Sequence, residues 1–176
     1  MTHQEESPEN ITQKNEQLTL LFAHYGRAIY IGQVLEQETI NMVAIDEIVT
    51  TNPESEAEYD TIWAKYDTSK QMMGIMTSLL QQAYQIDEAD IEELKHLLAL
   101  KNDLAGIYFR FNDLTAASAE DTERMINDFE GFTDRVQVIN EKLRLYRQAY
   151  STQTGMTDER IATAFAVRKT EVPTIG

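Results

Sequence analysis

Residues 125–150 read MINDFEGFTDRVQVINEKLRLYRQAY, and this stretch decides the fold class. Two series of apolar residues run through it, each repeating at intervals of seven. They are Met125, Phe132, Ile139 and Tyr146 in one series, and Phe129, Val136, Leu143 and Tyr150 in the other. Apolar residues in heptad register line the face of a helix that packs against another helix. The stretch therefore predicts a long helix with Ser118 as its N-cap, and its partner helix belongs either to the same chain or to a second copy.

The rest of the chain predicts further long helices. Apolar spacings of three and four predict helices over about 13–49, 55–80 and 87–109, with a break at Thr68-Ser69 in the second, and a short helix from Thr157 to Val167. The chain has only 7 Gly and 3 Pro, too few for the many turns of a β protein. We therefore expect an all-α fold, an antiparallel bundle of four to five long helices followed by a short C-terminal helix.

The expected organisation has three parts. Residues 1–12 are polar and acidic and predict a disordered leader, residues 13–150 predict the helical bundle domain, and residues 151–176 predict the short helix and a tail. Gly32 and Ala28 lie on the apolar face of the first helix. Because glycine and alanine have small side chains, a partner helix is expected to approach closely there.

The chain is strongly acidic, with 15 Lys and Arg against 30 Asp and Glu and a formal net charge of −15. Phosphate neutralisation needs clustered basic residues, so this charge argues against direct binding of nucleic acid. It also disfavours acidic membrane surfaces, and the sequence has no apolar run long enough to span a membrane. The absence of cysteine and of a secretory signal fits a reducing compartment. We expect a cytoplasmic protein.

Known catalytic and metal-binding patterns are missing from the sequence. The three histidines, His3, His24 and His96, are far apart and form no ligand pair. Five carboxylates lie within residues 87–93, but their spacing lacks the central glycine of a calcium loop and suits the positive N-terminal end of a helix. We therefore predict no metal site and no cofactor.

The apolar stripe of the third helix is interrupted in residues 100–109, LKNDLAGIYF, where Lys101 and Asn102 occupy a turn that should be apolar. An unpaired buried polar group costs about 1–3 kcal/mol. One interpretation is structural: the Lys101 stem follows a groove while Asn102 forms a hydrogen bond with a neighbouring helix. The other is a residual pocket for a nucleotide-like or other anionic ligand. Gly106 then either makes room for that ligand or lets another helix approach.

Residues 94–109, LKHLLALKNDLAGIYF, resemble the signature helix of the HEPN superfamily, which includes nucleotide-binding and RNase-like helical domains. The typical pattern there is Arg-Asn-x-x-x-His followed by aromatic residues. In this chain the Arg position is Lys101, the amide is Asn102, the His position is Gly106, and Tyr108 is a trailing aromatic residue. Residues 25–28, Tyr-Gly-Arg-Ala, also resemble the opening helix of standalone members.

The resemblance implies a dimer, and its departures imply a lost activity. In the RNase members the His transfers protons and the Arg stabilises phosphate charge. Glycine has no side chain to carry a proton, and lysine lacks the planar fork of arginine. We therefore expect no catalytic residues and no enzyme activity, and interpret the chain as a non-catalytic, homodimeric module that binds a protein partner. Two alternatives stay open: an acidic mimic that occupies the basic groove of a nucleic-acid-binding protein, and a residual ribonuclease or nucleotide-binding activity using Lys101 and Asp103.

Overall fold

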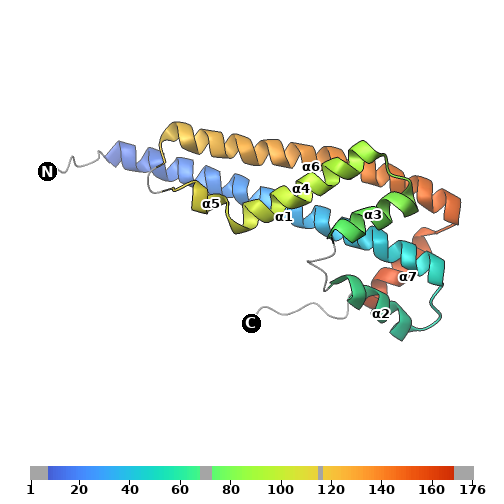
Figure 1. Ribbon diagram of the computed structural model, residues 1–176. Coiled ribbons are helices and arrows are strands. Elements are labelled where there is room, and N and C mark those ends of the chain that lie inside the picture. Colours follow the sequence, from blue (N-terminus) through green and yellow to red (C-terminus); the bar gives the residue numbers. More distant parts are fainter. Residues whose placement is uncertain (1–7, 68–72, 115–116, 169–176) are drawn as a thin grey trace. The chain divides into compact units, whose positions relative to one another are not determined.

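The computed structural model describes residues 8–67, 73–114 and 117–168, and within these ranges it contains helices and no strand (Figure 1). The prediction of an all-α fold is confirmed, because the helices pack against one another as a bundle. The helices are α1 (Pro8–Thr51), α2 (Glu56–Asp67), α3 (Met73–Tyr84), α4 (Glu88–Gly106), α5 (Tyr108–Phe111), α6 (Ala119–Thr154) and α7 (Asp158–Arg168). None of these described helices is both long and apolar enough to cross a membrane.

Several helix boundaries differ by a few residues from the expected ones, as where α3 ends at Tyr84 and not near residue 80, and two differences change the predicted organisation. Helix α1 begins at Pro8, so part of the leader predicted over residues 1–12 is helical, and proline suits the first turn of a helix because it has no backbone N–H to leave unpaired. The helix predicted through residue 109 ends at Gly106, and the short α5 follows. The remaining leader, the break at Thr68-Ser69 and the tail from residue 169 lie outside the described residues.

The chain divides into two compact units. Unit 1 comprises residues 1–34 and 97–138, and unit 2 comprises residues 35–96 and 139–176. Helices α1, α4 and α6 contribute residues to both units, while α5 belongs to unit 1 and α2, α3 and α7 belong to unit 2. The single domain expected over residues 13–150 stays a prediction.

The core of unit 1 confirms the heptad pattern of α6. Apolar side chains of α1, α4 and α6 are almost completely buried in it: Leu21, Ala28, Leu97, Leu104, Met125, Phe129, Phe132 and Val136. Residues that repeat every seven positions along α6 thus face the same core. Ser118 caps α6 as predicted, because its Oγ accepts a hydrogen bond from the backbone N–H of Asp121 at 3.1 Å.

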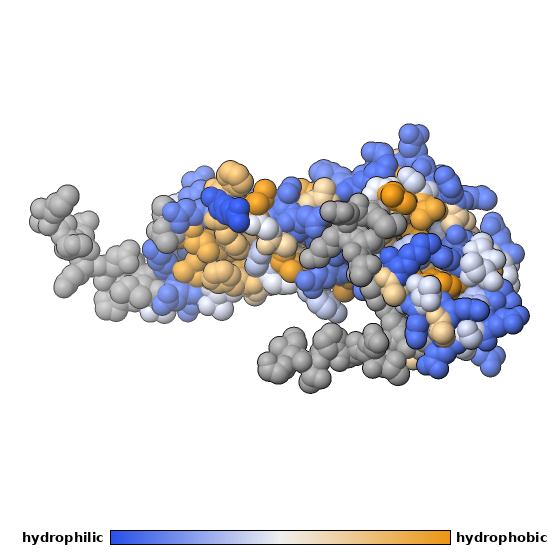
Figure 2. Space-filling view, turned by 60° about the horizontal axis from the view of Figure 1, so that its bottom comes forward, coloured by the Kyte–Doolittle hydropathy of each residue, from blue (hydrophilic) through white to orange (hydrophobic). Residues whose placement is uncertain are grey.

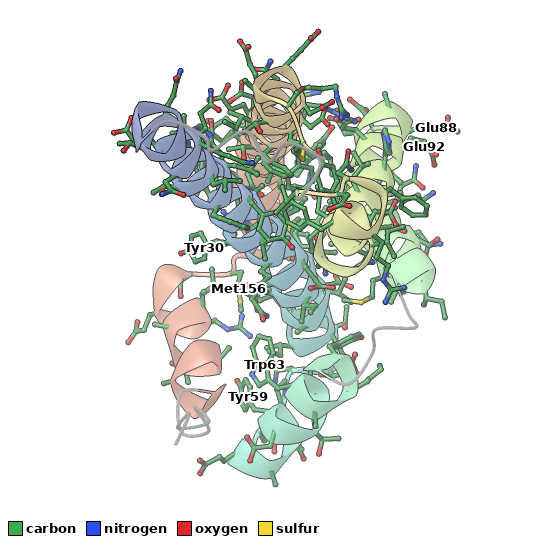
Figure 3. All side chains as sticks on the ribbon, turned by 90° about the vertical axis from the view of Figure 1, so that its left-hand side faces the viewer. Tyr30, Tyr59, Trp63, Glu88, Glu92 and Met156 are labelled. Atoms are coloured by element: carbon green, nitrogen blue, oxygen red, sulfur yellow. The ribbon has the colours of Figure 1, made fainter. Side chains whose placement is uncertain are left out.

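Unit 2 is held together by buried polar contacts as well as by an apolar core. Ile139, Leu143 and Tyr150 continue the heptad series and are buried, whereas Tyr146 is half-buried. Trp63 of α2 donates an indole hydrogen bond to the carbonyl of Ala164 in α7 at 3.1 Å. Figure 3 shows Trp63 and Tyr59 between these two helices. This hydrogen bond therefore helps to hold α7 against α2.

The acidic start of α4 has a structural role in unit 2. Asp90 is buried and accepts hydrogen bonds from Lys142 Nζ and from the Tyr146 hydroxyl, both of α6. Glu88 and Glu92 of the same helix are exposed and point outward (Figure 3). Among the described residues, no group of three or more histidine, aspartate or glutamate side chains is arranged to hold a metal ion.

Candidate functional site

The interrupted stripe lies in unit 1, at the end of α4. Lys101 is only 9% exposed and continues the buried stripe of Leu97 and Leu104. Asn102 is exposed, so the expectation that it lies on the core face is wrong. The reason is helical geometry: successive residues turn by about 100°, which carries Asn102 off the face that positions 97, 101 and 104 share. Among the described residues, no hydrogen bond joins Asn102 to a neighbouring helix.

Lys101 is buried because its side chain packs against Gly32 of α1. A Cβ atom added to Gly32 would lie 2.5 Å from Lys101 Cγ, 3.2 Å from Lys101 Cβ and 3.3 Å from Phe132 Cζ. Real Cβ atoms essentially never lie within 3.0 Å of such an atom, so a larger residue at this point of α1 would force Lys101 to shift. The close approach expected at Gly32 is confirmed, and the stem of Lys101 fills it as an apolar chain.

Gly106 marks the end of α4 and is exposed. A Cβ atom added there would meet nothing within 4 Å. The expectation that Gly106 lets another helix approach is therefore wrong for the described residues. Glycine is common where helices end, so the position of Gly106 at the end of α4 accounts for this glycine without a close helix contact.

The residues after Gly106 belong to an aromatic cluster. Phe109 contacts Tyr25 edge-on at a centroid distance of 4.8 Å, and Tyr108 contacts Phe129 at 4.9 Å. Tyr25 also lies 5.4 Å from Phe129 and donates a hydrogen bond from its hydroxyl to the Leu104 carbonyl at 3.1 Å. The last carbonyls of a helix lack intrahelical partners, so this bond stabilises the end of α4.

Tyr108 is half-buried, and its hydroxyl donates a hydrogen bond to Asp128 Oδ2 at 2.8 Å. Burial raises the pKa of Tyr108 above its ordinary value, and the hydrogen bond to the Asp128 carboxylate raises it further. The hydroxyl therefore stays protonated at neutral pH. Tyr108 acts as a donor that fixes α5 to α6, and it cannot serve as a base there.

The histidines do not replace the one that the resemblance requires. His24 is part of unit 1, and its Nδ1 lies 3.4 Å from Glu130 Oε1. His96 belongs to unit 2 and is exposed, and His3 lies outside the described residues. Of the four motif residues, Lys101 is thus buried, Tyr108 is half-buried, and Asn102 and Gly106 are exposed.

A groove lies beside this segment, and sequence reasoning missed it. It has a volume of about 520 Å³ between the end of α4, α5 and α6, and we call it the α5 groove. Its lining is mostly apolar, and two of its apolar side chains are exposed, Ile107 by 39% and Phe111 by 81%. Figure 2 shows hydrophobic side chains gathered on the part of the surface that carries α5.

The groove arises from the break after Gly106. Ile107 has φ −131° and ψ −12°, which is outside helical geometry, so α5 starts in a new direction. The only signal in the sequence is the pair of apolar residues Ile107 and Phe111, four positions apart and away from the buried stripe. Because we predicted a continuous helix through residue 109, these two residues did not stand out from the other apolar residues of that helix.

Comparison of the chain with protein-family models gives no match, and comparison with curated proteins and with solved structures gives no significant match.

Proposed function

We propose that this chain is a non-catalytic helical interaction module, related to the HEPN superfamily, that binds a protein partner in the α5 groove. The observation that carries the proposal is the exposure of Phe111 beside an apolar hollow. Large apolar side chains exposed at the rim of an apolar groove are typical of surfaces that bind another protein.

The partner that fits this groove is an amphipathic helix with basic residues beside its apolar face. The groove is lined by two carboxylates, Asp103 and Asp128, against one guanidinium, Arg135. The whole chain carries a net charge of −15, so a basic partner is attracted before it docks. An amphipathic helix lays its apolar residues into such a groove at spacings of three and four.

The proposed absence of catalysis rests on the residues of the motif in α4 and α5. Gly106 has no proton to transfer, the stem of Lys101 is packed against Gly32, and the Tyr108 hydroxyl is held by Asp128. Incubation of the purified chain with single-stranded RNA is expected to leave the RNA intact. RNA cleavage that is lost in both Lys101→Ala and Asn102→Ala would overturn this part of the proposal in favour of a residual ribonuclease.

Groove binding is tested with two labelled 18-residue peptides of the same amphipathic pattern, one of leucine and lysine and one of leucine and glutamate. Fluorescence anisotropy should show binding of the lysine peptide alone. Phe111→Ser should weaken this binding about tenfold or more, because buried aromatic anchors dominate such interfaces. Leu145→Ser is the matched control, since Leu145 is a large apolar side chain that is 53% exposed in unit 2. Equal affinities for wild type and Phe111→Ser would contradict the proposal.

The proposal includes the homodimer and the cytoplasmic location expected from the sequence. An exposed stripe on α1 supports the dimer: Leu20, Tyr30 and Val34 are separated by ten and four positions, which places them on one side of the helix. Apolar residues at that spacing pack against a second helix, and a second copy of the chain offers the same stripe. The absence of cysteine supports the cytoplasm.

A further inference from the structure

A second hollow lies within unit 2, independent of the α5 groove. It has a volume of about 660 Å³, within the range of pockets that hold small organic ligands. Residues of α1 and α6 form most of its walls, with Tyr84 of α3 and Ile161 of α7 completing them. We call it the Arg147 pocket, after the arginine on its α6 side.

Part of the wall is fixed by hydrogen bonds. The Tyr84 hydroxyl donates to the Met42 carbonyl at 2.7 Å, and the Tyr150 hydroxyl donates to Asp46 Oδ1 at 2.8 Å. The two tyrosine rings lie 4.3 Å apart with an interplanar angle of 31°. Burial raises the pKa of both tyrosines, so each hydroxyl stays protonated and committed to its bond. This wall is therefore formed before any ligand arrives.

Arg147 leaves one hydrogen-bond donor unused. Its Nη1 lies 2.6 Å from Glu38 Oε1, but the two atoms are not aligned as a hydrogen bond. Its Nε is buried and has no hydrogen-bond partner among the described residues. Glu38 Oε1 is likewise buried without a hydrogen-bond partner among the described residues, so this ion pair satisfies neither group fully. The Arg147 side chain is 42% exposed, and its guanidinium can therefore exchange part of this pairing for a ligand oxygen.

The pocket is lined by more basic than acidic side chains. Its lining contains Arg144 and Arg147 against Glu38 alone, although the chain has twice as many acidic as basic residues. Arg144 Nε donates to Glu141 at 3.0 Å, and Glu141 does not line the pocket. Guanidinium groups bind carboxylate or phosphate oxygens especially well, so two arginines in the lining favour an anionic ligand.

The lining also contains apolar side chains, Met42, Ile45 and Ile161. We propose that the Arg147 pocket binds a small organic anion whose acidic group accepts a hydrogen bond from the Arg147 guanidinium and whose apolar body contacts these three side chains. The acidic group is a carboxylate or a phosphate. Either one presents negatively charged oxygens, and in either case the group is attached to an apolar body.

The ligand class is tested by calorimetric titration of the full chain with four probes. Benzoate and phenyl phosphate should bind saturably, with Kd about 1 mM or tighter for ligands of this size. Benzamidinium has the same ring with a positive charge, and inorganic phosphate has the charge without the ring. Both should bind at least about tenfold more weakly. The tighter of the two organic anions identifies the acidic group, and inorganic phosphate binding as tightly as both would overturn the role of the apolar side chains.

The site is tested with two variants and a matched control. Arg147→Lys keeps a positive charge beside Glu38 but lacks the planar guanidinium group, and should weaken benzoate binding about tenfold. Arg144→Gln should weaken it as well, whereas Arg124→Gln should not, because Arg124 forms the same kind of i,i+3 pair with Asp121 in unit 1. No saturable binding of either organic anion, or unchanged binding in Arg147→Lys, would overturn the proposal.

The position of bound benzoate is measured independently, from the isoleucine methyl signals in NMR spectra. Benzoate should shift the signals of Ile45 and Ile161, which line the pocket, and leave Ile107 of the α5 groove unchanged. Shifts at Ile107 alone would place the anion in the other hollow and refute the assignment to unit 2.

Discussion

At the scale of single residues, the contact between Gly32 and Lys101 explains the polar interruption of the apolar stripe. Lys101 replaces an apolar residue because its stem fits where α1 has no side chain, and its Cγ would collide with a Cβ at position 32. Long side chains of this kind bury their carbon stems on apolar surface. The lysine is thus compatible with the core because of a glycine on another helix, 69 positions away in the sequence.

Gly32→Ala should therefore destabilise the protein, by up to about 2 kcal/mol. Overpacking a core costs about 1–3 kcal/mol, from which a gain of up to about 1 kcal/mol for replacing glycine in a helix is subtracted. Chemical denaturation measures the free energy of unfolding. Gly26→Ala is the control on the same helix, because a Cβ there meets nothing within 4 Å, and it should stabilise the protein by about 0.5–1 kcal/mol.

The partner of Gly32 is identified by a double-mutant cycle. Lys101→Ala removes the atom at 2.5 Å, so Gly32→Ala should cost less in that background than in wild type. Additive effects of the two substitutions would show that Lys101 is not the residue with which the new methyl group collides.

Sequence reasoning predicted one half of this contact. The spacing of Gly32 on an apolar face indicated a close approach of helices, and the structure confirms it. The spacing could not show that Lys101 is the residue that approaches, since that depends on how α4 is rotated about its axis. The same rotation places Asn102 outside the core, which is why its prediction as a core residue was wrong.

At the scale of helices, the strongest predictions came from repeated patterns and the weakest from short breaks. The heptad series of α6 and its N-cap, Ser118, were predicted correctly, since both signals are local. The break at Ile107 was not predicted, because residues 104–109 contain no proline and continue a helical pattern. The α5 groove depends on that break, so it was missed as well.

The cap of α6 gives a prediction with a defined pH dependence. Asp121 Oδ2 accepts hydrogen bonds from the backbone N–H and the hydroxyl of Ser118, at 3.0 and 2.8 Å. The Ser118 side chain, followed by its backbone N–H, lowers the pKa of Asp121 below its ordinary value. Ser118→Ala should therefore raise the pKa of Asp121 toward that value, as measured by NMR titration of its carboxyl carbon.

The stability of the variant follows the same titration. A carboxyl whose pKa is lowered by folding stabilises the folded state above its unfolded pKa, and this stabilisation is lost as pH falls through the folded pKa. The cost of Ser118→Ala should thus be largest near neutral pH and shrink in acid. Ser78→Ala is the control, because the Ser78 hydroxyl only donates to Gly74 within α3 and its effect should not vary with pH. An unchanged Asp121 titration in Ser118→Ala would contradict this account.

At the scale of the whole molecule, the sequence predicted the fold class but gave no sign of two units. Composition and periodicity were sufficient for an all-α bundle, because they are averages over many residues. The division falls inside three helices: between residues 34 and 35 of α1, between 96 and 97 of α4, and between 138 and 139 of α6. The apolar repeat of α6 continues through that point, as Val136 and Ile139 are both buried, so no change in pattern marks it.

The homodimer is the prediction that belongs to this scale. Static light scattering at micromolar concentration should give about twice the chain mass of 20.2 kDa. If the α1 stripe forms the interface, Tyr30→Glu should produce monomers, because Tyr30 is 66% exposed at the middle of the stripe and a carboxylate buried there would meet its copy in the partner. Val138→Glu changes another exposed apolar residue, on α6, and should remain dimeric, as should Phe111→Ser in the α5 groove. A wild-type particle with the mass of one chain would refute the dimer, and a dimeric Tyr30→Glu would place its interface elsewhere than on α1.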